Sequence, residues 1–363
     1  MTMLSRRTLV GSGLVLAAAG AAGYSLWPRM GDYLAAVDQQ RRLPAGDATV
    51  QELVRMATLA ANGHNTQPWR FRLDGQNVSI LPDPSRRTAV VDPDDHHLFV
   101  SLGCATENLV IAGAALGRHG EVVIGPGADP KIDIALSSAQ PGRQDLFQAI
   151  PLRQSTRSVY DGQPVSAADL ARLEAAAREE GVTVLIFTDA ADRDAILDFV
   201  VAGNSAQMDD PAFVQELADW IRFSSVRAVE TGDGLFAACS GNPVMPEWIG
   251  RRMFPLVFRK DSENDKYRAQ VRSSAGVAVF IGAAADPQHW IRVGRSFQRF
   301  ALEATALGIR TAHVNQPVEV PHVRAEFARW LGMPEVRPDL VVRFGRAPAL
   351  PMSLRRPIGA VLA

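Results

Sequence analysis

The segment 60–71 constrains this chain more than any other, and it reads Ala-Ala-Asn-Gly-His-Asn-Thr-Gln-Pro-Trp-Arg-Phe. It follows a helical pattern of apolar residues over 50–61 and precedes a strand-like segment over 71–81. In the loop between them, the side-chain amides of Asn65 and Gln67 stand two residues apart beside a rigid Pro-Trp pair. An amide presents a donor and an acceptor in one plane. That arrangement suits the alternating C=O and N–H edge of a flavin ring.

Five residues in two places are candidates for binding a phosphate group. Arg153, Ser155 and Arg157 alternate along the chain, and Arg355 and Arg356 lie near the C-terminus. Alternate residues of an extended segment face one way, so the first three side chains are expected to converge. Guanidinium groups bind phosphate through charge-assisted, bidentate hydrogen bonds. Either cluster alone is typical of a solvated basic face, but together with the amide loop they fit a flavin mononucleotide (FMN).

These elements resemble the motifs of the nitroreductase-like flavin oxidoreductases, most closely the Acg family of FMN-binding oxidoreductases. In that family a loop like His-Asn-Thr-Gln-Pro-Trp is a signature, and an Arg-x-Ser-x-Arg segment binds the FMN phosphate. The resemblance covers most of residues 34–363. It implies that five residues contact the flavin ring or shape its pocket: His64, Asn65, Thr66, Gln67 and Trp69. It implies that the phosphate end is held by Arg153, Gln154, Ser155, Arg157, Arg355 and Arg356.

The order of helix and strand patterns predicts an α+β fold rather than a Rossmann fold. Helical patterns over 103–117 and 294–308 share their Gly-to-Gly spacing and an Ala-Leu-Gly ending, and a β-rich segment follows each. With the resemblance, this repeat implies two fused nitroreductase-like halves, 31–149 and 150–363, each with a mixed or antiparallel sheet flanked by helices. Neither half repeats the other's binding element. We therefore expect a monomeric pseudo-dimer with one intact and one decayed flavin site.

Local patterns predict several further elements. A short helix is expected over 32–42, and another begins after Ser166, with an acidic residue three positions on. Strands are expected over 182–187, 277–281 and 340–344.

Residues 204–270 resist regular assignment, because aromatic and methionine side chains alternate there with glycine-rich turns. A long excursion of this composition is typical of a lid-like insertion that covers a functional site. An insertion packed away from any site is the alternative.

The N-terminal residues 1–30 are interpreted as a targeting segment outside the fold. The pair Arg6-Arg7 precedes an apolar run over 10–27, which indicates a twin-arginine signal peptide or an uncleaved anchor. The twin-arginine export machinery would then be a partner. The expected location is the periplasm or the outer face of the inner membrane. Cys104 and Cys239 could pair there, although the apolar surroundings of Cys104 favour a buried thiol.

Several other chemistries are disfavoured. A net charge of −1 gives no argument for nucleic acid or an anionic membrane surface. The run Asp92-Pro93-Asp94-Asp95-His96-His97 has metal-ligand residue types, but they are crowded rather than spaced for a coordination shell, so a turn and helix cap is favoured and no metal is expected. His313 follows a strand and is a weak catalytic candidate, since a lone histidine there is more often structural.

The resemblance implies an FMN-dependent oxidoreductase in which the flavin carries the chemistry. NAD(P)H or another donor would reduce the flavin, and a small organic acceptor would then take the electrons. The alternative is an exported protein that binds or sequesters flavin, with the 204–270 lid over the ring and little turnover.

Overall fold

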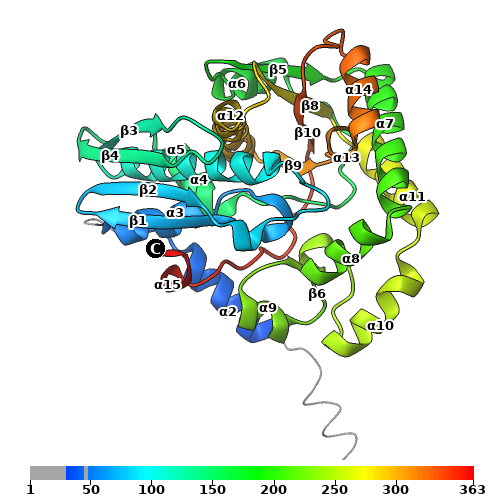
Figure 1. The fold of residues 1–363 in the computed structure, drawn as a ribbon, viewed down its shortest axis with the longest axis horizontal. Coiled ribbons are helices and arrows are strands. Elements are labelled where there is room, and N and C mark those ends of the chain that lie inside the picture. Colours follow the sequence, from blue (N-terminus) through cyan, green and yellow to red (C-terminus); the bar gives the residue numbers. More distant parts are fainter. Residues whose placement is uncertain (1–29, 45–47) are drawn as a thin grey trace, which may run out of the picture.

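The computed structural model describes residues 30–44 and 48–363 (Figure 1). The predicted twin-arginine segment lies outside the described residues. Helices surround two separate four-stranded sheets in which every pairing is antiparallel. The predicted α+β class with two sheets is therefore confirmed.

The first sheet is built before residue 150 and has the strand order β1-β2-β4-β3. Its strands are β1 (Trp69–Asp74), β2 (Asn77–Pro82), β3 (Arg118–Ile124) and β4 (Ile132–Ser138). The segment 71–81 was predicted as one strand and is instead the β1–β2 hairpin, because Gly75 adopts a φ of 58° that reverses the chain. The helices of this half are α2 (Met30–Arg41), α3 (Val50–Thr58), α4 (His96–Ala115) and α5 (Gln144–Ala149).

The second sheet lies after residue 150 and has the order β5-β8-β10-β9. Its strands are β5 (Val182–Phe187), β8 (Gly276–Gly282), β9 (Arg310–His313) and β10 (Pro338–Gly345), which confirms the three strands predicted here. Every residue of β8 and β10 is buried, since helices cover both faces of the sheet. Those helices include α6 (Ala167–Ala176), α7 (Ala190–Met208), α12 (Pro287–Ala306), α13 (Gln316–Glu319) and α14 (Pro321–Trp330). The side chain of Ser166 caps α6 as predicted.

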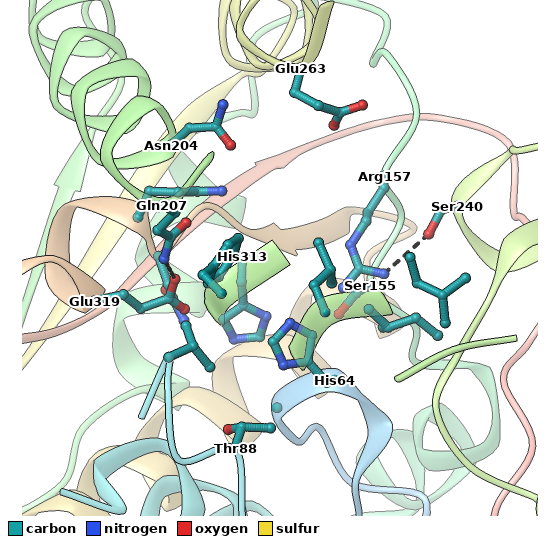
Figure 2. Close-up of a pocket in the computed structure, with 18 of the residues that line it drawn as sticks. His64, Thr88, Ser155, Arg157, Asn204, Gln207, Ser240, Glu263, His313 and Glu319 are labelled. Carbon is teal, nitrogen blue, oxygen red and sulfur yellow. Dashed lines mark hydrogen bonds between the residues drawn. The ribbon is translucent and has the colours of Figure 1, made fainter. Parts of the chain in front are cut away.

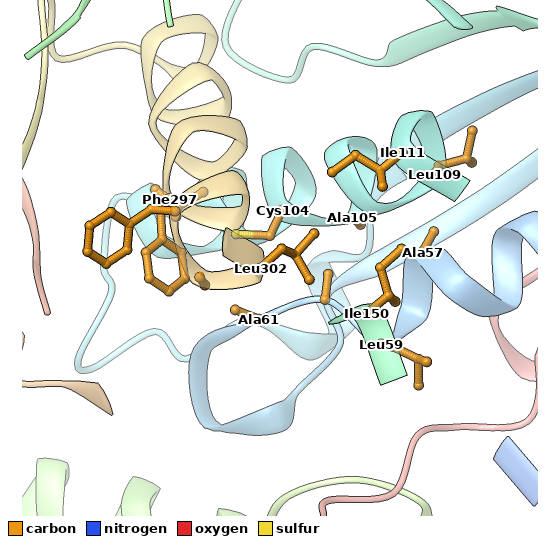
Figure 3. Packing of buried hydrophobic residues seen from close by; sticks show 14 of the residues in the cluster. Ala57, Leu59, Ala61, Cys104, Ala105, Leu109, Ile111, Ile150, Phe297 and Leu302 are labelled. Carbon is orange, nitrogen blue, oxygen red and sulfur yellow. The ribbon is translucent and has the colours of Figure 1, made fainter. Parts of the chain in front are cut away.

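Helices α4 and α12, which carry the repeated Gly-to-Gly pattern, cross in the centre of the molecule. A Cβ on Gly103 would lie 2.0 Å from the carbonyl oxygen of Ile291, and one on Gly294 would lie 2.0 Å from that of Val100. The two glycines thus allow the backbones of α4 and α12 to pack directly against each other. The thiol of Cys104 donates to the Gly294 carbonyl at 3.2 Å, so this cysteine is a buried core residue. Figure 3 shows the apolar cluster around the crossing.

Helix α4 is long and apolar enough to cross a membrane, but 89% of its most apolar stretch is buried inside the fold. The packing of both halves against α4 is therefore enough to explain its hydrophobicity.

The excursion 204–270 is mostly helical, so the expectation of an irregular segment was wrong. Beyond the end of α7 it contains α8 (Pro211–Trp220), α9 (Ser225–Thr231), α10 (Glu247–Val257) and α11 (Lys260–Arg272), with the short parallel pair β6 (Ile221–Arg222) and β7 (Leu235–Phe236). The side chains of Asp210 and Ser224 cap α8 and α9. These helices are 7 to 13 residues long and are separated by turns, so no long periodic run marks the segment.

Two isolated bridges extend the sheets, and one of them joins the two halves. Ser155 forms an isolated parallel bridge with Thr311 at the edge of the second sheet, and both residues belong to the second half. After β10, the C-terminal tail 346–363 returns to the first half, and Leu362 bridges Phe71 of β1. The tail carries the short helix α15 (Ile358–Val361) beside α3. The return of the tail brings residues about 300 positions apart to one place.

Candidate functional site

A cavity of about 470 Å³ lies where the two halves meet the excursion (Figure 2). Its walls come from the amide loop, from α4, α7 and β9, and from the excursion itself. A smaller cavity of about 60 Å³ adjoins it. The two share the lining residues Ala61, Asn62, Ser155, Arg157 and Leu235.

The smaller cavity is dominated by buried arginines. Arg153 and Arg355 line it with only 3% and 4% of their surface exposed, and Arg41 lies behind them with 8% exposed. Within the described residues, no carboxylate forms an ion pair with any of the three. Burial lowers the pKa of Arg41 and of Arg153 to about 10, and the pKa of Arg355 is also lowered by burial and by the two other guanidiniums. This is a concentrated positive charge without a neutralising partner.

Backbone carbonyls at the C-terminal end of α3 hold these guanidiniums in place. Arg355 donates to the carbonyls of Thr58 (2.6 Å), Leu59 (3.2 Å) and Ala60 (3.2 Å). Arg153 donates only to Leu59, at 3.2 Å, and its Nε has no hydrogen-bond partner. The partial negative charge of a helix C-terminus compensates part of the cluster's charge. Arg153 therefore keeps hydrogen-bonding capacity for a ligand.

Arg41 is the site residue that the sequence interpretation missed. It was passed over because the Arg41-Arg42 pair does not match an Arg-x-Ser-x-Arg pattern. Its guanidinium donates to the carbonyls of Pro151 (2.7 Å) and Ser353 (3.2 Å), so it ties together the segments that carry the other arginines. The local signal was limited to an arginine pair at the end of a short, polar helix.

The amide loop has a strained backbone. His64, Asn65 and Gln67 adopt φ values of 46°, 55° and 56°, in the left-handed region that non-glycine residues rarely occupy. Such strain persists only where the surroundings fix it, and it concentrates at functional sites. The structure holds the loop with side-chain hydrogen bonds to two distant segments.

The amides of Asn65 and Gln67 make those bonds. Asn65 Nδ2 donates to the carbonyls of Gly234 (3.0 Å) and Leu354 (3.1 Å), and its Oδ1 has no partner. Gln67 Nε2 donates to the carbonyl of Gly232 at 2.9 Å, and its Oε1 accepts from the Arg356 backbone at 2.8 Å. These amides tie the loop to the excursion and to the C-terminal tail.

The structure therefore separates the predicted ring-contacting and phosphate-contacting residues into two groups. The following residues line one or both cavities: His64, Asn65, Arg153, Gln154, Ser155, Arg157, Arg355 and His313. The other four line neither: Thr66, Gln67, Trp69 and Arg356. Trp69 is fully buried in the core of the first half. Gln67 and Arg356 bind each other and support the loop from behind.

Three histidines, His64, His97 and His313, line the larger cavity. Burial lowers the pKa of each, to about 4 for His64 and His97 and to about 3 for His313. They are therefore uncharged near neutral pH. In Figure 2, His64 and His313 lie in the middle of the cavity, between Arg157 on one side and Glu319 on the other.

The excursion contributes an apolar wall. Phe223, Met245 and Phe254 line the cavity. Two other aromatic residues that were expected to cover a ring do not line the cavity. Trp248 is 64% exposed, and the ring of Trp220 packs against the guanidinium of Arg86. Only part of the predicted aromatic cover therefore reaches the cavity.

The wall opposite Arg157 is polar and was not predicted from the sequence. Asn204 and Gln207 of α7 and Gln316 and Glu319 of α13 line it. These residues fall in segments without a recognisable motif, and only the packing of α13 against α7 brings them together.

Asp92, His96 and His97 have potential metal-ligand atoms within 4.8 Å of one another. All three already have partners. Asp92 accepts from the backbone of His97 (3.0 Å) and Leu98 (3.0 Å) at the start of α4, and His96 Nε2 lies 2.8 Å from an oxygen of Asp339. These contacts account for the residues as a helix cap and a buried pair.

No family model matches the chain. Two Mycobacterium tuberculosis proteins named as candidate NAD(P)H nitroreductases are similar to it. Rv3131 is 27% identical over 337 residues, covering 86% of this chain and 91% of that protein. The protein named acg is 24% identical over 330 residues, covering 86% and 94%.

Among solved structures, the FMN-dependent nitroreductase NfnB of Mycobacterium smegmatis in complex with NADPH has a TM-score of 0.36 at 15% identity, covering 56% of this chain and 88% of that one. A nitroreductase with bound FMN from Bacteroides fragilis has a TM-score of 0.34 at 18% identity, covering 56% and 88%. At these TM-scores the likeness carries no argument about this chain.

Proposed function

We propose that this chain is an FMN-dependent oxidoreductase of nitroreductase type, which binds one FMN without a covalent bond and reduces a small organic acceptor. NAD(P)H is the proposed donor. The names of the two M. tuberculosis relatives support this, since the similarity extends over 86% of the chain.

The observation that carries the proposal is the buried arginine cluster at the mouth of a larger cavity. Three buried guanidiniums without a carboxylate are costly, because each loses its hydration and repels the others. A phosphate dianion supplies the missing negative charge and acceptors for unused N–H groups. The adjoining cavity has the volume typical of a small-molecule or cofactor site. The residues present thus fit a flavin mononucleotide.

Arg153, Ser155, Arg157 and Arg355 would hold the phosphate end, and the larger cavity beside His64 would take the ring. Gln67 and Arg356 would act by positioning the strained loop. When bound, the flavin supplies hydride and electron transfer. The chain orients it and screens the cavity from water with the apolar wall of the excursion.

The visible spectrum and FMN content of the purified protein test the proposal directly. The double variant Arg153→Ala/Arg157→Ala should lose FMN, with affinity falling by roughly two to four decades, because each hydrogen bond to a charged group contributes about 1.5–3 kcal/mol. The control Arg268→Ala removes an exposed arginine paired with Asp265 and should keep its FMN. Undiminished FMN in the double variant would refute the phosphate site.

A flavin-sequestering protein with little turnover is the second candidate, because Phe223, Met245 and Phe254 wall the cavity. Rapid bleaching of the flavin by NADPH, followed by repeated turnover with a quinone, supports the oxidoreductase. Bleaching that stays slow at saturating NADPH supports sequestration.

We also propose a monomer that is exported by the twin-arginine route to the periplasm or the outer face of the inner membrane. Cell fractionation of the wild type and of an Arg6→Lys/Arg7→Lys variant tests the route. Retention of only the variant in the cytoplasm is the expected result.

A further inference from the structure

We propose that Glu319 is the proton donor to the acceptor bound in the larger cavity, and that the acceptor is a polar two-electron acceptor such as a quinone. This inference rests on the proposed flavin-dependent reduction. It assigns a chemical role to the polar wall of the cavity.

Glu319 is held by one of its two carboxyl oxygens. Gln207 Nε2 of α7 donates to Glu319 Oε2 at 2.6 Å. His97 Nδ1 lies 3.8 Å from Oε1, which is beyond hydrogen-bond distance. Within the described residues, no donor reaches Oε1. The side chain lines the cavity and is 17% exposed, so Oε1 is the oxygen open to a bound molecule.

The surroundings favour the neutral acid. Burial raises the pKa of Glu319, and the Asp92 carboxylate raises it further, while His97 and Gln207 act in the opposite direction. His97 carries little charge near neutral pH, since its own pKa is lowered to about 4. On α11, Lys266 is paired with Glu263 at 3.4 Å, and the pKa of Tyr267 is raised. Within the described residues, His97 is the only cation-forming group that acts on the Glu319 carboxyl, and Arg157 lies on the opposite side of the cavity.

The position of Glu319 suits proton delivery at the acceptor end. Arg157 and Ser240 lie on one side of the cavity, and Glu319, Gln207 and Asn204 lie on the opposite side (Figure 2). With the phosphate held by the arginines, the polar wall faces the region left for the acceptor. The amides of this wall can orient carbonyl or nitro oxygens.

The step balances as follows for a quinone. A bound flavin reduced by NAD(P)H would supply two electrons and one proton as a hydride, which would form an O–H bond on one carbonyl oxygen. The displaced electron pairs move through the ring to the other oxygen, which takes the proton from Glu319. The quinone becomes a hydroquinone and Glu319 a carboxylate, which regains a proton from solvent.

The test compares Glu319→Gln with the wild type, and uses Glu326→Gln as a control that makes the same change at an exposed glutamate outside the cavity. After reduction by NADPH, each protein is reoxidised with benzoquinone, which needs a proton, or with ferricyanide, which takes one electron and no proton. We expect Glu319→Gln to slow the benzoquinone reaction by about 10²-fold, the usual contribution of a general acid, and to leave the ferricyanide reaction within about twofold. Equal slowing with both acceptors, or no slowing with benzoquinone, would overturn the proposal.

A second readout needs no turnover. In the flavin-free protein, the infrared carbonyl bands of protonated carboxyls should persist above the usual pH range of glutamate. Burial also raises the pKa of Asp92 and of Asp339, so the component that belongs to Glu319 is the one that Glu319→Gln removes and Asp339→Asn leaves in place. A spectrum that is unchanged in Glu319→Gln contradicts the assignment. Failure of the proposed function would look different, because the purified protein would then lack FMN in all variants.

Discussion

Replacing Arg153 by methionine should separate cofactor affinity from stability. Methionine keeps the length of the side chain and removes its charge. In the flavin-free protein Arg153 makes one hydrogen bond from its guanidinium, to the carbonyl of Leu59, and is 3% exposed. The site is thus costly to maintain when no anion is present.

The magnitudes can be compared from the structure. Lowering the pKa of Arg153 to about 10 corresponds to about 3 kcal/mol that opposes its charged form in the folded state. Methionine relieves this cost and loses one hydrogen bond of a charged group, about 1.5–3 kcal/mol. The two effects nearly cancel, so the free energy of unfolding of the flavin-free protein should change by less than about 1.5 kcal/mol. The loss of one charge-assisted contact to phosphate, in contrast, weakens FMN binding by roughly 10–10²-fold.

Thermal unfolding of the flavin-free protein and fluorescence titration with FMN measure the two quantities. Arg355→Met is the informative comparison, because that guanidinium donates to several backbone carbonyls and should lose stability as well as affinity. If Arg153→Met keeps its FMN affinity within a factor of about three, the anion site is misassigned. If it unfolds as readily as Arg355→Met, the stability argument fails.

Further predictions concern packing, pH and access. Gly103→Ala should lower the free energy of unfolding by about 3 kcal/mol, since its Cβ would lie 2.0 Å from the Ile291 carbonyl oxygen. Gly359→Ala, whose Cβ would have no atom within 4 Å, should leave the free energy of unfolding unchanged. Calorimetry measures both. Burial raises the pKa of Asp339 to about 7, so the folded state binds the extra proton and stability should fall as pH rises from about 4 to 7 and then level off. Denaturation of Asp339→Asn across that range should show a smaller fall. Phe223→Ala should speed NADPH bleaching, and equal stopped-flow rates would show that this wall does not gate the cavity.

The sequence predicted those elements whose signals are local. The strand 182–187 has the predicted limits, and the Ser166 cap is made by its own neighbours. The Gly-to-Gly repeat marked two helices, but nothing local showed that Gly103 and Gly294 face each other.

The candidate site was only partly predictable, because its contacts cross the whole chain. The sequence indicates Asn65 and Gln67 as contacts to the ring edge, and this stays a prediction; their amides bind Gly234 and Gly232, which no pattern connects to the loop. Arg41 entered the site through carbonyls more than 100 residues away. The type and spacing of side chains indicate which ligand a site could bind. Hydrogen bonds to distant backbone groups decide which of those side chains remain free to bind it.

The return of the C-terminal tail to the first half also bears on how the protein folds. Arg41, Arg153 and Arg355 lie in three distant segments, so the arginine cluster cannot form before residue 355 has been synthesised. Closing such long loops carries an entropic cost, and the edge of β1 that Leu362 covers stays open until the tail has docked. A ligand that binds only the finished arrangement shifts the equilibrium toward the folded chain. Cofactor occupancy would then report that the tail has docked.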